Sequence, residues 1–223
     1  MSTYTPEDSD AHGNFAAKAA LLVVGFVWGG NFAATKFALE AFSPWTFRTV
    51  SYTAGAVLLM LVAVLAGASL RVDRASDRLH LAISGLFGCA GFGALSAIAV
   101  LHTSTGRAAI CTYTMPIWAV LLSRVVLKEP LTVSRVASLT LCCAGLSILL
   151  WPLVRADVSL GVLAALGAAV SWAIAVVYLK WARVTAHPFA MAVWQLLAGA
   201  IASAIGALFE SHAAWTPMGT LPM

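Results

Sequence analysis

The chain has 223 residues and a formal net charge of +4, and 61% of its residues are apolar while 10% are charged. An ordinary soluble domain has about 45–50% apolar and about 25% charged residues, so the composition excludes that class. The basic residues are scattered between apolar runs, which argues against a nucleic-acid partner. All four cysteines lie inside apolar runs, so neither a disulfide framework nor a metal site is expected, and no cofactor is predicted.

Residues 1–15 are polar and acidic and lack the features of a secretory signal, so we interpret them as a cytoplasmic tail. Seven apolar runs follow, each close to the about 20 residues with which a helix crosses a bilayer. They cover residues 16–39, 45–67, 79–101, 107–127, 133–151, 160–181 and 189–209, and residues 210–223 form a carboxyl-terminal tail. Because none of the runs alternates as barrel strands do, the sequence predicts an all-α polytopic membrane protein in contact with the lipid bilayer.

The basic residues near the ends of these runs predict the orientation of the chain. Nine of them fall on the side of the amino terminus and four on the other side: Lys18, Arg71, Arg74, Arg78, Arg124, Lys128, Arg135, Lys180 and Arg183 against Lys36, Arg48, Arg107 and Arg155. Short loops rich in Lys and Arg stay in the cytoplasm. The amino terminus is therefore predicted to be cytoplasmic.

An internal repeat links the first run to the sixth. Sliding the chain by 144 positions aligns Trp28 with Trp172, Lys36 with Lys180, Pro44 with Pro188 and Gly55 with Gly199. Five spans separate the copies, an odd number, so the copies are predicted to be inverted in the membrane. Inverted repeats are typical of secondary transporters, which bind their solute between the two halves. We expect a first unit of five helices at residues 16–155 and a partial second unit of two helices at residues 156–209.

Small residues recur every four positions in two of the runs. They are Gly85, Cys89 and Gly93 in the third run, and Gly199, Ser203 and Ala207 in the seventh. Such stripes let helix backbones approach closely in membranes. The pattern therefore predicts helix–helix contacts through these residues.

Two motifs resemble the drug/metabolite transporters of the EamA type. One is Trp28-Gly29-Gly30-Asn31-Phe32 with Lys36, Ser43-Pro44 and Arg48, and the other runs from Thr103-Ser104-Thr105 through Pro116 to Lys128-Glu129-Pro130-Leu131-Thr132. The resemblance implies a ten-helix transporter built as five plus five helices in the plasma membrane or cell inner membrane. It also implies alternating access for small solutes such as amino acids, other metabolites or toxic compounds. The last three helices of that plan are not expected in this chain.

Other functions remain alternatives at this stage. The chain is either a transporter on its own or a truncated, non-transporting paralogue or subunit, which would act as a homodimer or with a complementing chain. An intramembrane enzyme is less favoured, since the sequence has no His-Glu-x-x-His helix, no phosphate-binding loop and no pair of aspartates within a span. No carboxylate lies in the middle of a run, which favours facilitated diffusion or exchange over proton coupling within this chain.

Several polar and aromatic residues inside the runs are candidates for a solute site. Arg48 lies about a turn inside the second run, where a charge either reaches back to the interface or attracts an anionic solute. Pro116 is expected to bend the fourth run and free a carbonyl group beside Tyr113. The repeat-related Trp28 and Trp172 lie deeper than an interfacial belt requires. They either pack in the core or wall a cavity together with Asn31, Tyr52 and Gln195.

Overall fold

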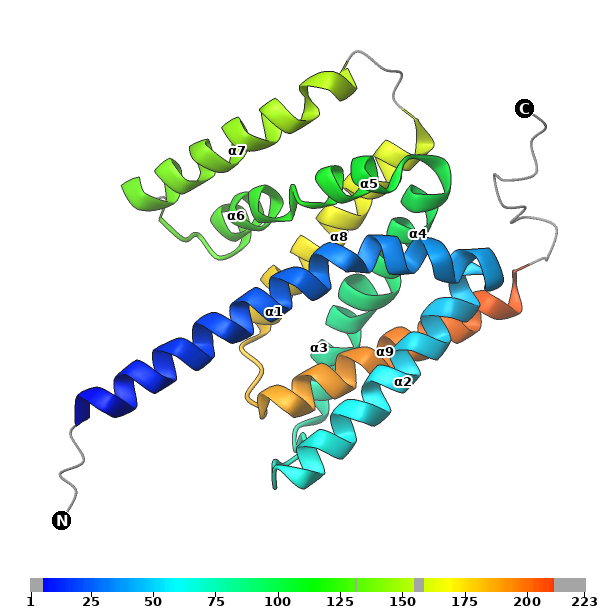
Figure 1. Cartoon of the computed structure of the whole chain (residues 1–223). Coiled ribbons are helices and arrows are strands. Elements are labelled where there is room, and N and C mark those ends of the chain that lie inside the picture. The colour runs from blue at the N-terminus through cyan, green and yellow to red at the C-terminus, as the bar shows by residue number, and fades with distance from the viewer. Residues whose placement is uncertain (1–5, 131, 155–158, 211–223) are drawn as a thin grey trace.

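The computed structural model describes residues 6–130, 132–154 and 159–210, and these residues form helices without any strand (Figure 1). The helices are α1 (Pro6–Ala41), α2 (Pro44–Leu65), α3 (Ala75–Gly85), the π-helical segment η1 (Leu86–Gly91), α4 (Phe92–His102), α5 (Thr105–Thr112), α6 (Met115–Val126), α7 (Val133–Val154), α8 (Leu160–Ala182) and α9 (Pro188–Leu208). The predicted boundary at 155/156, residues 1–5 and the tail beyond Glu210 lie outside the described residues.

Within the described residues, six segments are long and apolar enough to cross a bilayer. They are α1 from Leu21 onward, α2, the third span (α3, η1 and α4), the fourth span (α5 and α6), α8 and α9. In α7 the apolar part is shorter, Val133–Leu149. The all-α, polytopic membrane architecture predicted from composition is thus confirmed.

The residues that begin the helices explain where the helix starts differ from the predicted ones. Proline has no N–H to donate and its φ suits the first helical turn. Pro6 begins α1 ten residues before the predicted start, and Pro44 and Pro188 begin α2 and α9. The third span begins at Ala75 rather than at residue 79, so that Asp77 lies in its first turn, where the helix dipole favours a carboxylate.

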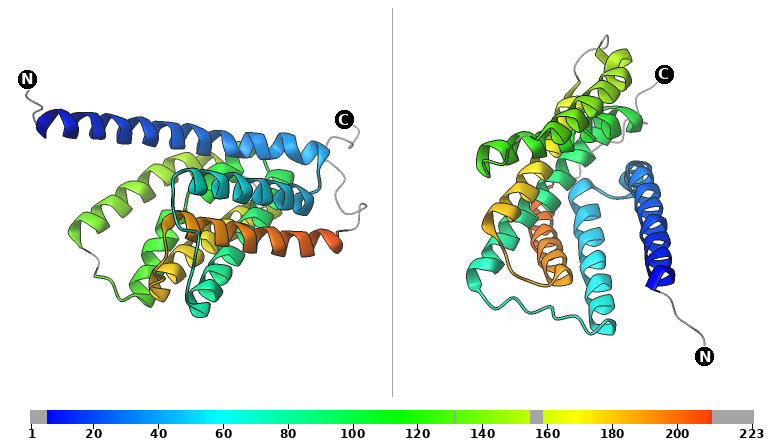
Figure 2. Two further views of the ribbon diagram at one scale, coloured as in Figure 1. Left: turned by 90° about the horizontal axis from the view of Figure 1, so that it is seen from below. Right: turned by 90° about the vertical axis from the view of Figure 1, so that its left-hand side faces the viewer.

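The core of the bundle is built around α8 and α9. Helix α8 packs against α4, α6 and η1, and α9 packs against α2 and α3. Close contact is possible because α8 presents small side chains that are fully buried, namely Ala165, Ala168, Ala169 and Ala173. Helix α1 lies at the edge of the bundle, and most of the described side chains of α1 are exposed (Figure 2).

The repeat-related helices run in opposite directions, α1 against α8 and α2 against α9 (Figures 1 and 2). Their contacts are also reciprocal. A Cβ atom added to Gly55 would lie 3.8 Å from Leu196 Cδ1, and one added to Gly199 would lie 3.5 Å from Tyr52 Cδ2. Since Gly199 and Leu196 lie 144 positions after Gly55 and Tyr52, this is the exchange of contacts that a two-fold axis produces. The geometry therefore agrees with an inverted repeat.

Candidate functional site: a central cavity

A cavity of about 260 Å³ lies between the helices of both predicted repeat units. Its walls come from α1, α2, the third and fourth spans and α8. The lining residues are Trp28, Asn31, Phe32, Arg48, Tyr52, Gly88, Phe92, Tyr113, Met115 and Trp172. Six of the eight site residues predicted from the sequence are in this set, so we call it the central cavity.

Arg48 reaches into the protein and not toward the membrane interface. Its side chain is buried, with 6% of the residue exposed. Its Nε donates to the carbonyl of Gly93 at 3.2 Å, and its Nη2 donates to Ser96 Oγ at 3.0 Å. Its guanidinium also lies 5.0 Å from the centre of the Phe47 ring. Both acceptors are neutral, and no carboxylate forms an ion pair with Arg48 among the described residues.

The two repeat-related tryptophans meet at the cavity. The ring centres of Trp28 and Trp172 are 6.4 Å apart, and their planes are inclined by 74° in an edge-to-face arrangement. On the next wall, Phe32 and Tyr113 make a similar contact at 6.2 Å. The cavity therefore combines aromatic walls with one buried cation.

The π-helical segment η1 forms part of the cavity wall through Gly88. In a π-helix the backbone bonds shift to i→i+5, and such segments are frequent at functional sites. Two hydroxyl groups hold this geometry, since Tyr52 donates to the Cys89 carbonyl at 2.7 Å and Ser171 donates to the Phe87 carbonyl at 2.8 Å. Side chains from α2 and α8 thus bond to carbonyls of η1.

The fourth span is interrupted where Pro116 predicts a bend, because α5 ends at Thr112 and α6 begins at Met115. The break places Tyr113 and Met115 at the cavity, whereas Pro116 itself is exposed and does not line it. The break lies where the bend was predicted, and the exposed ring of Pro116 is not part of the cavity wall.

Gln195 also lies elsewhere. It is not among the residues that line the cavity, and its backbone packs on the third span, where a Cβ added to Gly85 would lie 2.5 Å from the Gln195 carbonyl oxygen. Phe32, Gly88, Phe92 and Met115 line the cavity without having been predicted. The glycine-rich third span was a signal for Gly88, but apolar side chains in an apolar helix give no such signal.

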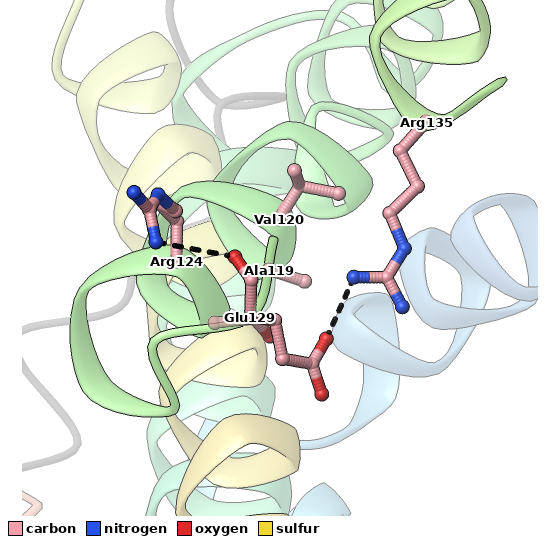
Figure 3. A pocket seen from close by; sticks show the side chains of 6 residues that line it. Ala119, Val120, Arg124, Glu129 and Arg135 are labelled. Carbon is pink, nitrogen blue, oxygen red and sulfur yellow. Dashed lines mark hydrogen bonds and ion pairs between the residues drawn. The ribbon is translucent and has the colours of Figure 1, made fainter. Parts of the chain in front are cut away.

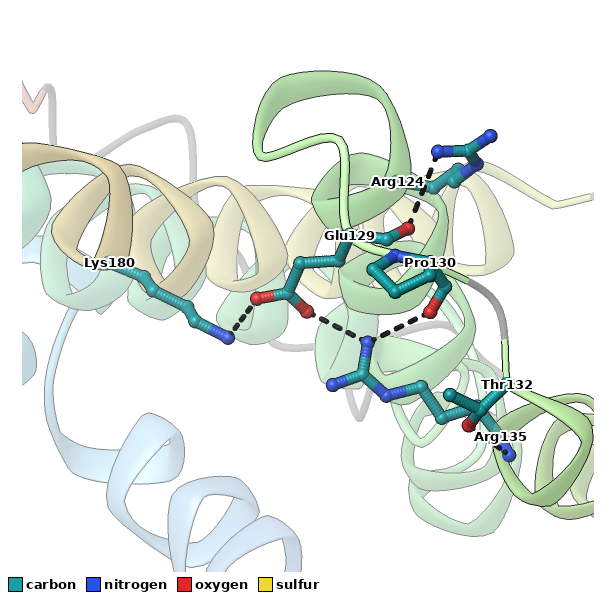
Figure 4. A network of polar contacts seen from close by, with 6 residues as sticks. All are labelled: Arg124, Glu129, Pro130, Thr132, Arg135 and Lys180. Carbon is teal, nitrogen blue, oxygen red and sulfur yellow. Dashed lines mark hydrogen bonds and ion pairs between the residues drawn. The ribbon is translucent and has the colours of Figure 1, made fainter.

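An ion-pair network lies at the end of the bundle that is predicted to be cytoplasmic. Glu129, in the loop after α6, pairs through Oε2 with Arg135 of α7 at 3.0 Å and through Oε1 with Lys180 of α8 (Figure 4). Arg135 also donates to the Pro130 carbonyl at 3.3 Å. Glu129 lies between Arg124 and Arg135 beside a pocket of about 240 Å³ (Figure 3). The network therefore ties the loop of the first unit to the second unit.

The hydrogen bond from Lys180, with the charges of Lys180 and Arg135, lowers the pKa of Glu129 below its ordinary value of 4.5. A lowered pKa in the folded state stabilises the protein above pH 4.5, and this contribution is lost as the pH falls through the folded-state value. We expect Glu129→Gln to lower the unfolding temperature slightly at pH 7, because such partly exposed pairs contribute little, and to make no difference in acid. Thermal unfolding in detergent at several pH values measures this.

Asp73→Asn is the matched control, since it removes the exposed pair of Asp73 with Arg71, at 2.6 Å, which bridges no helices. That variant should unfold as the wild type does at each pH. If the unfolding temperatures of wild type and Glu129→Gln still differ in acid, the ion pairs are not the cause of that difference.

Comparison with known proteins agrees with this geometry. The profile of the EamA-like transporter family matches residues 16–151. The uncharacterized transporter YoaV of Bacillus subtilis is 27% identical over 202 residues, which cover 88% of this chain and 69% of YoaV. The uncharacterized transporter YvbV of the same organism is 30% identical over 205 residues, which cover 89% of this chain and 67% of YvbV. No solved structure is significantly similar to the chain. With its apolar helices and its match to the family over more than half its length, the chain is a multi-pass plasma-membrane protein that belongs to the EamA-like transporter family.

Proposed function

We propose that the chain transports a small metabolite that carries a carboxylate, such as an amino acid or a related acid, without changing it chemically. The central cavity is the proposed binding site, and Arg48 is the observation that supports it. A buried cation without an ionised partner is costly in a membrane protein and normally marks a pathway or a ligand. A carboxylate in the cavity would supply the missing negative charge and accept charge-assisted hydrogen bonds from the guanidinium.

The rest of the cavity fits the remainder of such a solute. Trp28, Trp172 and Tyr113 offer apolar and cation-binding ring faces, while Asn31 offers an amide for orientation. The volume of about 260 Å³ is smaller than the about 300–1,000 Å³ of sites for drug-sized ligands. The size therefore favours a metabolite over a large drug.

Alternating access is the proposed mechanism. The cavity lies between the two predicted inverted units. In transporters built from such units, the two halves rock around a binding site in this position. Because Glu129 ties the loop after α6 to α8 at the predicted cytoplasmic end, opening toward the cytoplasm would have to separate Glu129 from Lys180. The network is thus expected to hold that end closed while the cavity faces outward.

Uptake by proteoliposomes that contain the purified chain tests the proposal. Labelled amino acids and dicarboxylates should accumulate above the level of empty liposomes, and an excess of the same unlabelled solute should compete. Organic cations should not compete. Competition by organic cations as strong as that by carboxylates would contradict a substrate recognised through its carboxylate.

A subunit that works only with a complementing chain is the second candidate, and the open side of the cavity favours it. Trp28 is 49% exposed and Tyr113 is 36% exposed although both line the cavity. Folded protein that takes up no solute alone, yet binds labelled carboxylates in an Arg48-dependent manner, would support this second function over the first.

A further inference from the structure

A groove of about 470 Å³ runs between α3 and α9, away from the central cavity, and all of its lining residues are apolar. On α9 it follows one stripe of the helix, formed by Trp194, Ala198, Ala202 and Ile205. Ala82 of α3 and Leu86, the first residue of η1, form the facing wall. The small side chains of Ala198 and Ala202, in the middle of the α9 stripe, leave the space open. A wall without polar groups fits only an apolar occupant.

The length of the groove corresponds to one lipid leaflet. Trp194 and Ile205 are eleven helical steps apart, which is about 16 Å at a rise of 1.5 Å per residue. The hydrocarbon core of a bilayer is about 30 Å thick, so a single leaflet contributes about half of that. One acyl chain, lying along α9, therefore matches the groove from one end to the other.

Arg78 lies at the predicted cytoplasmic end of this groove. It precedes Ala82 by four residues and so lies on the same face of α3, and its guanidinium is 5.9 Å from the centre of the Trp194 ring. Its Nε donates to the Val72 carbonyl at 2.8 Å, which fixes the group while its Nη atoms make no hydrogen bond within the described part of the chain. Arg78 is exposed.

Among the residues that the structure describes, the neighbouring carboxylates do not form an ion pair with Arg78. Arg71 and Asp73 pair with each other at 2.6 Å, and Asp77 in the first turn of α3 is buried. Arg74 is exposed and precedes the first residue of α3. The mouth of the groove is therefore positive, with the Arg78 guanidinium beside the Trp194 ring.

We propose that this groove and Arg78 form a binding site for an anionic phospholipid. The phosphate of the headgroup accepts hydrogen bonds from the Arg78 Nη atoms, and one acyl chain lies over Trp194 and along α9. The apolar groove would accept a chain from any phospholipid, so Arg78 supplies the preference for negative headgroups. The site does not depend on the transport proposal, since none of its residues lines the central cavity.

Fluorescence quenching by brominated lipids tests the site in the full chain. The protein is reconstituted in phosphatidylcholine vesicles in which part of the lipid is phosphatidylglycerol or phosphatidylcholine with dibrominated chains. The difference between wild type and Trp194→Phe isolates the emission of Trp194. We expect dibrominated phosphatidylglycerol to quench this emission at about fivefold lower mole fraction than dibrominated phosphatidylcholine, since one interfacial basic residue contributes about 1 kcal/mol to anionic-lipid binding.

Variants distinguish the contribution of the lipid headgroup from that of the acyl chain. Arg78→Gln should abolish the preference while leaving quenching by phosphatidylcholine unchanged, and Arg78→Lys should keep part of it. Arg183→Gln, which removes an exposed arginine at the end of α8, should keep the full preference. Ala198→Phe should weaken quenching by both lipids because it fills the groove. The proposal is overturned by equal quenching from both headgroups in the wild type, by a preference that survives Arg78→Gln, or by a Trp194 that neither lipid quenches.

Discussion

Replacing Arg48 with glutamine is expected to weaken the binding of carboxylate solutes roughly 30- to 150-fold. The substitution removes a charged donor whose hydrogen bonds contribute about 2–3 kcal/mol, and each 1.4 kcal/mol corresponds to a factor of ten in affinity. The concentration dependence of uptake in proteoliposomes measures the change. Arg48→Lys keeps the charge but loses the planar fork that matches a carboxylate, so an intermediate loss is expected.

Two controls make this result specific. Lys36→Gln removes an exposed basic residue near the same end of the bundle and should leave uptake unchanged. Thermal unfolding should show that Arg48→Gln is folded. The substitution removes a buried charge that no carboxylate in the described residues balances, so it leaves no unpaired charge behind. Wild-type uptake by folded Arg48→Gln would rule out Arg48 as the anion-binding group.

Gly199→Ala is expected to destabilise the protein by about 1–3 kcal/mol although it adds a single methyl group. A Cβ atom at position 199 would clash with the Cβ of Cys89 and would lie 3.6 Å from the backbone nitrogen of Ala90 in η1. The Ala90 nitrogen is a backbone atom, and the Cys89 Cβ is held in place by the backbone that carries it. The contact is therefore relieved only by moving a helix, and overpacking of this kind costs about that much. The unfolding temperature in detergent, with equilibrium unfolding in mixed micelles, measures the change.

Gly25→Ala is the matched control, because a Cβ atom at Gly25 would meet nothing within 4 Å. This variant should be as stable as the wild type or up to about 1 kcal/mol more stable, since alanine is the better helix former. Cys89→Gly should restore part of the stability of Gly199→Ala by removing the opposing Cβ. If Gly199→Ala and Gly25→Ala unfold alike, the close packing of α9 on η1 does not limit stability.

The sequence predicts the membrane helices and much of the cavity for identifiable physical reasons. Run length and hydropathy report spans directly, because the bilayer has a fixed thickness. Trp28 and Trp172 were proposed because they occupy corresponding places in the predicted repeat, and their rings meet at the cavity. Arg48 was found because a charge inside an apolar run has few explanations.

The remaining features depend on contacts that an apolar helix does not encode. A helix that is hydrophobic all round has no polar face to show which side meets the cavity. Pro116 and Gln195 were therefore assigned to the cavity without knowledge of their orientation, and Phe32 and Phe92 were passed over for the same reason. The π-helical segment follows from hydroxyl groups of α2 and α8, which lie far away in the sequence.

The π-helical segment η1 also sets the phase of everything that follows it in the third span. Each residue of a helix turns the chain by about 100°, so a segment that accommodates a wider turn acts as a one-residue insertion. Deleting a single residue between 86 and 91 would leave an unbroken helix of nearly the same length. It would also turn Gly93 and Ser96, which accept hydrogen bonds from Arg48, by about a quarter of a revolution away from α2.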